Sequence, residues 1–143
     1  MYEMMFPYVV GVLMAWITWY PARHLDARTE QWYFTVIITI VALGFIGFPI
    51  EDGDPAAILY ELGALLVLVT LIILSRKVAL VLLPVVWFAH GTWDLLYLIG
   101  FIPVDKPDWV VQLCVPYDWL LSAYLFRRVS TWRSASADTA APS

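Results

Sequence analysis

The chain has 143 residues, of which 62% are hydrophobic and only 14% are charged. A soluble domain is nearer about 25% charged, so this composition excludes an ordinary soluble protein and is typical of a membrane protein. The formal net charge is −4, and no basic patch with interleaved aromatic residues indicates a nucleic-acid-binding protein.

Five apolar runs follow one another along the chain, each close to the roughly 20 residues that a helix needs to cross a bilayer. A lone strand in lipid would leave its backbone polar groups unsatisfied, so all five runs are predicted to be helices. The predicted spans are Met5–Tyr20, Trp32–Phe48, Pro55–Ser75, Val78–Ile102 and Asp108–Phe126. We therefore expect an all-α, five-helix transmembrane bundle over residues 1–133, followed by a flexible polar tail over residues 134–143.

The breaks between the runs carry turn and cap signals. Pro49 is expected to end the second helix, because proline removes a backbone donor. Asp54 suits the N-cap of the third helix and Pro55 its first position. Ser75–Val78 is expected to form a very short hairpin between the third and fourth helices, and the proline-containing segment 103–108 a turn before the fifth.

The basic residues indicate an orientation in the membrane. Seven of the eight Lys and Arg residues lie in the first loop, in the short hairpin between the third and fourth helices, and after the fifth helix. These segments share one side of the predicted bundle, and the opposite side holds only Lys106. The seven are Arg23, Arg28, Arg76, Lys77, Arg127, Arg128 and Arg133. Because basic loops stay in the cytoplasm, the N-terminus is predicted to lie outside and the C-terminus inside, in a multi-pass protein of the cell (inner) membrane.

Three carboxylates and one histidine lie inside the apolar runs. With a helical rise of about 1.5 Å per residue, Glu61, Asp94 and Asp118 lie roughly 9, 12 and 15 Å from the outer ends of their helices. His90 lies one turn deeper than Asp94 on the same face. A charged Asp at the centre of a span costs at least about 2.5 kcal/mol, so we expect these groups to face a shared protein interior rather than lipid.

These polar residues are the predicted catalytic site. Its members are Glu61, His90, Asp94 and Asp118. Neighbouring aromatic residues are predicted to line a pocket for a ligand, and they are Tyr60, Trp87, Trp93, Tyr97, Tyr117 and Trp119. Several other aromatic residues lie near the ends of the runs, where membrane proteins carry interfacial belts.

Two short segments carry a resemblance. His90–Asp94 reads H-x-x-W-D, and Cys114–Asp118 reads C-x-x-Y-D. The pair resembles small, uncharacterised bacterial integral membrane proteins that contain both segments, which implies a bacterial multi-pass protein and no particular activity. Five helices with buried acids and aromatic residues are also loosely similar to the emopamil-binding sterol isomerase family, as an analogy of fold alone.

The residues leave several functions open, and whether the protein is an enzyme is one of them. A buried acid and a histidine in an aromatic pocket are typical of a site that binds or transforms a small lipophilic ligand by isomerase- or cyclase-type acid–base chemistry, without a cofactor. The same residues are compatible with polar contacts between helices in an accessory subunit of a larger membrane complex, or in a homo-oligomer. They also suit a proton-coupled carrier of a cationic solute.

A metal site built on His90, Cys114 and carboxylates is the last alternative, but no paired ligand spacing supports it, so no metal is predicted. The expected partners are the lipid bilayer and a lipophilic small molecule. A ligand site predicts a cavity among the third, fourth and fifth helices, whereas a scaffold predicts tight packing there, with every acid bonded to a protein donor.

Overall fold

The computed structural model of the chain describes residues 2–102 and 106–140, and every regular element in these two ranges is a helix. Five helices are long and one is short. Their bounds are α1 Tyr2–Ala22, α2 Ala27–Phe45, α3 Gly47–Asp52, α4 Pro55–Lys77, α5 Leu82–Leu98 and α6 Asp108–Ala140. The prediction of an all-helical fold with five long helices is confirmed.

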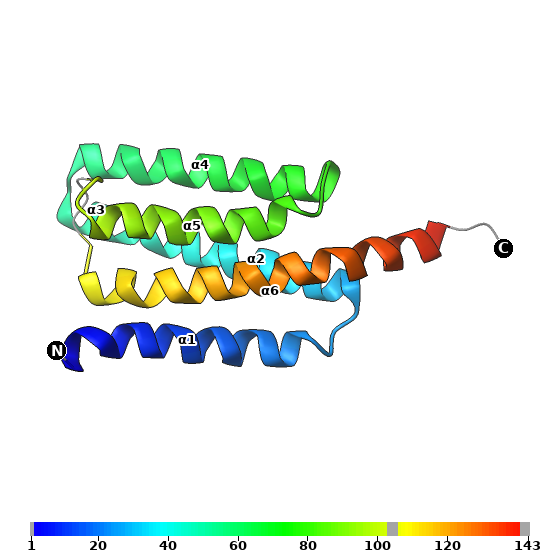
Figure 1. Ribbon diagram of the computed structural model, residues 1–143. Coiled ribbons are helices and arrows are strands. Elements are labelled where there is room, and N and C mark those ends of the chain that lie inside the picture. The colour runs from blue at the N-terminus through cyan, green and yellow to red at the C-terminus, as the bar shows by residue number, and fades with distance from the viewer. Residues whose placement is uncertain (1, 103–105, 141–143) are drawn as a thin grey trace.

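The five long helices run side by side along one direction, and α6 extends beyond the others at its C-terminal end (Figure 1). Helix α6 packs against both α5 and α1, while α4 packs against α5 and α2. The helices nearest the centre of the bundle therefore include α5 and α6, which carry the buried residues His90, Asp94, Asp118 and Ser122.

Local sequence explains where several helices begin and end. Asp26 caps α2 by accepting hydrogen bonds from the backbone N–H groups of Arg28 and Thr29, each 3.0 Å long. Asp54 caps α4 through the N–H of Ala56, with Pro55 in the first helical position, as predicted. Such caps satisfy backbone donors that have no partner within their own helix.

The second helix differs from its predicted limits at both ends. It begins at Ala27 instead of Trp32, because the Asp26 cap starts the helix before the apolar run. It ends at Phe45, and the short α3 follows with Pro49 inside its first turn instead of after the last. A proline is tolerated there, because the N–H groups of a first helical turn have no helical partner.

The later boundaries differ as well. Helix α4 continues to Lys77, so the turn before α5 lies at residues 78–81 rather than at Ser75–Val78. Helix α5 ends at Leu98 because Gly100 takes a left-handed conformation, with φ of 74°, that closes the helix end. Part of the predicted turn, residues 103–105, lies outside the described residues.

The expected polar tail is helical where it is described. Helix α6 passes Phe126 and continues to Ala140, so the segment from residue 134 is not an irregular coil as far as Ala140. This segment is rich in alanine and serine and contains no glycine or proline before Pro142, so nothing in it interrupts a helix. The flexibility of the tail stays a prediction, and residues 141–143 lie outside the described part of the chain.

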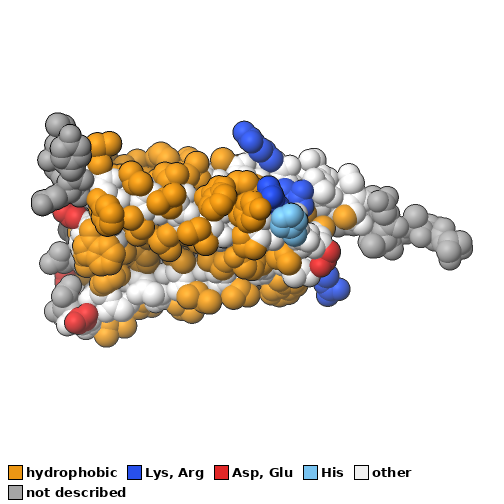
Figure 2. Space-filling view, turned by 90° about the horizontal axis from the view of Figure 1, so that it is seen from below, with side chains coloured by type: hydrophobic (Ala, Val, Ile, Leu, Met, Phe, Trp, Pro, Cys, Tyr) orange, Lys and Arg blue, Asp and Glu red, His pale blue; other side chains and the backbone are white. Residues whose placement is uncertain are grey.

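The bundle is apolar both inside and outside. Its core contains fully buried Phe34, Trp87, Leu121, Leu125 and Trp132. Large apolar side chains also cover the outer face, as the broad hydrophobic band of Figure 2 shows. By length and apolar composition, two of the described helices are able to cross a membrane, over Met5–Ala22 and Pro55–Lys77.

Two glycines allow close contact between helices. A Cβ atom at Gly11 of α1 would lie 2.1 Å from the carbonyl oxygen of Leu113 in α6. A Cβ atom at Gly91 of α5 would lie 2.9 Å from the Cβ of Asp118 in α6. Both distances are shorter than atoms tolerate, so α1 and α5 reach their present distance from α6 only because these side chains are absent.

Candidate functional site

His90 of α5 and Asp118 of α6 form the centre of the candidate site. The Nδ1 atom of His90 lies 2.7 Å from Oδ2 of Asp118, which is a short hydrogen bond between two buried side chains. Asp94, one turn further along α5, places its Oδ2 atom 3.9 Å from the same nitrogen. The structure thus brings together three of the four predicted catalytic residues, and one imidazole nitrogen faces both aspartates.

The fourth predicted residue, Glu61 of α4, joins the cluster through a lysine. The Nζ atom of Lys106 lies 2.8 Å from Oε1 of Glu61 and 3.6 Å from Oδ1 of Asp94. The indole N–H of Trp93 donates a 3.2 Å hydrogen bond to the same Glu61 oxygen. Glu61 and Asp94, on different helices, therefore share one buried ammonium group.

Sequence reasoning missed Lys106, which it assigned to an outer loop. The side chain is instead only 1% exposed, and its ammonium group lies 4.6 Å from the ring centroid of Phe45. Tyr97 holds the backbone of this residue, since its hydroxyl accepts a hydrogen bond from the N–H of Lys106 and donates one to the Lys106 carbonyl. The available signal was electrostatic, because three buried carboxylates require nearby positive charge.

A cavity of about 440 Å³ lies beside this cluster, between α2, α4 and α5. Its polar wall consists of Glu61 and His90, and the rest is largely apolar. The lining residues are Ala42, Phe45, Leu59, Tyr60, Glu61, Gly63, Ala64, Leu65, Val67, Leu68, Ala89, His90 and Trp93. Leu59 and Val67 are exposed on the outside of the bundle, so the cavity opens sideways onto the apolar surface.

The six predicted aromatic residues have different positions. Tyr60 and Trp93 line the cavity. Trp87 and Tyr117 lie outside it and pack against each other in the core, with ring centroids 5.8 Å apart. Tyr97 holds the backbone of Lys106, and the partly exposed Trp119 stacks on Phe88.

The prediction of a cavity among the third, fourth and fifth helices is wrong in part, because α2 supplies one wall of the cavity and α6 supplies none of its described lining residues. Ala42 and Phe45 of α2 face the space, and the Phe45 ring meets the imidazole of His90 edge to face at 5.2 Å. Asp94 and Asp118 do not line the cavity and lie behind His90. His90 is therefore the residue that connects the cavity to the buried aspartates.

Several atoms of the cluster have no hydrogen-bond partner among the described residues. They include both carboxylate oxygens of Asp94 and Oδ1 of Asp118, all of them buried. Buried polar atoms are nearly always hydrogen-bonded in folded proteins, so these oxygens retain the capacity to accept a hydrogen bond or to bind a cation.

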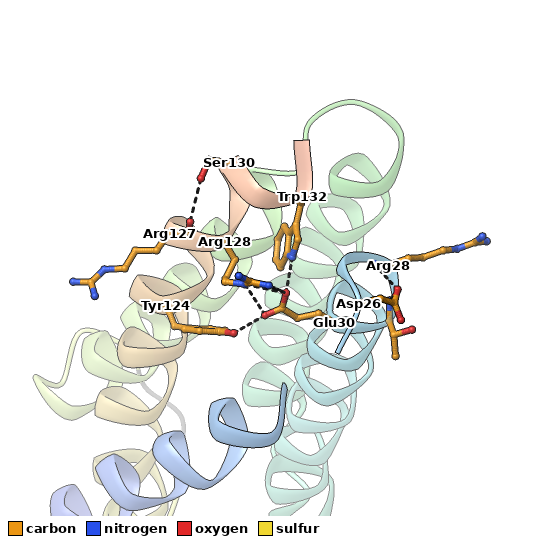
Figure 3. A network of polar contacts seen from close by, with 9 residues as sticks. Asp26, Arg28, Glu30, Tyr124, Arg127, Arg128, Ser130 and Trp132 are labelled. Carbon is orange, nitrogen blue, oxygen red and sulfur yellow. Dashed lines mark hydrogen bonds and ion pairs between the residues drawn. The ribbon is translucent and has the colours of Figure 1, made fainter. Parts of the chain in front are cut away.

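A second buried carboxylate, Glu30 of α2, lies toward the other end of the bundle (Figure 3). Arg128 of α6 donates to both carboxylate oxygens, through Nε at 3.0 Å and Nη2 at 2.9 Å. Tyr124 and Trp132 of α6 also donate to Glu30. Sequence reasoning missed this network. Every donor in this network comes from α6, so the network connects α2 to α6. We infer that its role is to stabilise the fold.

No protein-family model, no curated protein and no solved structure matches this chain. The resemblance of the H-x-x-W-D and C-x-x-Y-D segments therefore stays a prediction. The geometry places the two segments next to each other, since the first supplies His90 and Asp94 and the second supplies Asp118.

Proposed function

We propose that the chain is a five-span integral membrane protein of the cell (inner) membrane, with its N-terminus outside and its C-terminus in the cytoplasm. The exposed apolar side chains on all five long helices support this proposal, because soluble proteins rarely expose continuous apolar surface on this scale. Basic side chains gather at the end of the bundle where α1 ends and α6 projects (Figure 2). Lys106, at the opposite end, is buried, so the described residues of that end expose no Lys or Arg.

Within this membrane domain, we propose that the cavity between α2, α4 and α5 binds a small lipophilic molecule. The observation that carries this proposal is an apolar cavity of about 440 Å³ with the carboxylate of Glu61 and the imidazole of His90 in its wall. Its opening between exposed apolar residues suits a ligand that arrives from the bilayer. A polar group on the ligand would face Glu61 and His90, while its apolar body would lie against Leu65, Leu68 and Phe45.

The proposed chemistry is proton transfer of the isomerase or cyclase type. In an isomerisation, one group adds a proton to one carbon of a double bond, which leaves a cation on the other. A second group then removes a proton from the carbon bonded to that cationic centre, so the double bond moves by one position and no cofactor is consumed. Glu61 and His90 lie on different helices and form the ionisable pair at the cavity. Because Nδ1 of His90 faces the aspartates, Nε2 is the nitrogen left for the ligand.

The two observations that separate a ligand site from an accessory scaffold both favour the ligand site. A scaffold predicts a filled interior with every acid bonded to a donor. Here a cavity has Glu61 in its wall, and neither oxygen of Asp94 has a hydrogen-bond partner among the described residues.

Filling the cavity tests ligand binding. Gly63 lines the cavity, and a Cβ there meets no atom within 4 Å, so Gly63→Leu occupies the space without a clash at the backbone. Gly44 of α2 is equally free of contacts and does not line the cavity, which makes Gly44→Leu the matched control. Mass spectrometry of molecules extracted from the purified proteins should find a lipophilic species with wild type and Gly44→Leu, and much less with Gly63→Leu. Equal amounts in all three proteins would refute the proposal.

Cysteine labelling tests the orientation independently. Cys114 is the only cysteine, so Cys114→Ser provides a background for single cysteines at Glu51 and Arg133. A maleimide that does not cross membranes should label Glu51→Cys in intact cells, and should label Arg133→Cys only after the cells are opened. The reverse pattern would overturn the assigned orientation.

A further inference from the structure

The His90, Asp94 and Asp118 side chains offer three metal-ligating atoms that lie within 4.8 Å of one another. Two of them come from consecutive turns of α5 and the third from α6. All three residues are buried, and Asp94 and Asp118 are completely so. This arrangement is compact, and it is held from two helices that Gly91 allows to approach closely.

With all three carboxylates ionised, the protein alone does not balance the charge of the cluster. Glu61, Asp94 and Asp118 contribute three carboxylates, and Lys106 contributes one ammonium group. With a neutral imidazole, two negative charges stay uncompensated in a buried environment, where such charges are costly. One divalent cation would cancel both of them.

The two oxygens of Asp94 face different partners. Oδ1 is the atom near the Lys106 ammonium, whereas Oδ2 is the atom near Nδ1 of His90. Neither oxygen has a hydrogen bond from a described residue, although the side chain is fully buried. Lys106 thus neutralises Glu61 without occupying the side of Asp94 that faces the histidine, and Oδ2 is left for another cation.

We infer that His90 Nδ1, Asp94 and Asp118 bind a divalent transition-metal ion, for which Zn²⁺ is the best probe. Imidazole and carboxylate are ordinary zinc ligands, and tetrahedral coordination at 2.0–2.2 Å places ligand atoms about 3.3 Å apart. The distances from Nδ1 are 2.7 Å to Asp118 and 3.9 Å to Asp94, so they bracket this value. Binding would displace the proton now shared between His90 and Asp118, because a metal requires the lone pair of Nδ1.

The site is distinct from the cavity, although the two share His90. Asp94 and Asp118 lie behind the cavity wall, so the metal would hold the imidazole from behind and leave Nε2 directed to the ligand side. The buried thiol of Cys114 is outside the group of converging ligand atoms.

The test begins with the wild-type chain, purified without an affinity tag of histidines and incubated with Zn²⁺. Elemental analysis after dialysis should find about one zinc per chain. X-ray absorption at the zinc edge should show only nitrogen and oxygen neighbours near 2.0–2.2 Å, including one imidazole. A protein that retains no zinc, or a sulfur neighbour near 2.3 Å, would overturn the inference.

Substitutions then locate the ion. Asp94→Asn keeps the shape of the side chain, and its zinc affinity should fall by more than the roughly 10- to 100-fold that loss of an outer-sphere partner costs. Cys114→Ser and His24→Ala, which removes the only other histidine, should keep full zinc content. Full zinc binding by Asp94→Asn would contradict the assignment. If that variant does not fold, the absorption spectrum of the wild type still decides the question.

The cavity variant separates this inference from the proposed function. Gly63→Leu should lose the lipophilic ligand and keep its zinc, because Gly63 is not part of the His90, Asp94 and Asp118 group. Zinc without any bound ligand in the wild type would refute the function and preserve the metal site. A bound ligand without zinc in the wild type would refute the metal site and preserve the proposed function.

Discussion

Gly91 of α5 lies directly against Asp118 of α6, and a Cβ at Gly91 would be 2.9 Å from the Asp118 Cβ. This contact fixes how closely the histidine-bearing helix approaches its aspartate partner, because His90 is the neighbouring residue in α5. The hydrogen bond between His90 and Asp118 therefore forms only because residue 91 is a glycine and has no side chain.

The first prediction is that Gly91→Ala weakens the bundle and the site. The added methyl group forces α5 and α6 apart, which we expect to cost about 2–3 kcal/mol, more than the gain of about 1 kcal/mol that alanine brings to a helix. Thermal unfolding in detergent, followed by circular dichroism, should show a lower melting temperature. Gly63→Ala, whose Cβ meets nothing within 4 Å, should be neutral or stabilising. A Gly91→Ala protein as stable as wild type would show that the helices separate at no cost.

The second prediction concerns the buried ammonium group of Lys106. Lys106→Met removes the positive charge between Glu61 and Asp94 and leaves both carboxylates without it, which should cost about 3 kcal/mol. Adding Glu61→Gln removes one of the two stranded charges and should recover part of this loss. The free energies of unfolding of wild type, both single variants and the double variant measure the coupling. Additive effects of the two substitutions would mean that the pair does not interact.

The third prediction concerns the connection between α2 and α6. Glu30→Gln leaves the Arg128 guanidinium with a neutral partner, and weakens hydrogen bonds that involve charged groups, at a cost of roughly 2 kcal/mol. Urea unfolding, or the melting temperature in detergent, measures the loss. The exposed Glu51→Gln is the control for removal of one acidic charge, and it should change stability little. Equal effects at both positions would contradict a specific role for Glu30.

The fourth prediction is a dependence of the α2 N-terminus on pH. Hydrogen bonds from Thr29 hold the pKa of the exposed Asp26 carboxyl below its ordinary value, because they favour the charged form. A group with a lowered pKa stabilises the fold above its ordinary pKa, and this contribution is lost as pH falls through the lowered value. Asp26→Asn keeps the cap without titrating, so its melting temperature should fall less than that of wild type between pH 5 and pH 3. Parallel curves for the two proteins would show that Asp26 is not involved.

The fold was largely predictable, because helices in an apolar chain follow from local patterns. Runs of apolar residues near the length of a span gave the number of long helices, and Asp54 with Pro55 marked the start of α4 correctly. The errors occurred where local signals compete. Asp26 started α2 before its apolar run, and Gly100 ended α5 before its apolar run ended.

The convergence of the acids could also be anticipated, since the cost of a charge in lipid requires buried acids to face protein. The depth estimates placed Glu61, Asp94 and Asp118 in the same layer, and the structure connects them through His90 and Lys106. Their partners could not be anticipated, because spacing along one helix says nothing about which neighbouring helix or connection lies opposite.

The sequence by itself determined that this protein is helical and apolar on its surface, and that its few internal acids need each other or a cation. Only the tertiary structure decided that Lys106 turns inward, that α2 supplies a wall of the cavity, and that Nδ1 of His90 faces two aspartates. Hydropathy and helical periodicity are local properties of the chain. Distances between side chains on different helices depend on packing, which here is set by small residues such as Gly91 and by the contact of Tyr97 with Lys106.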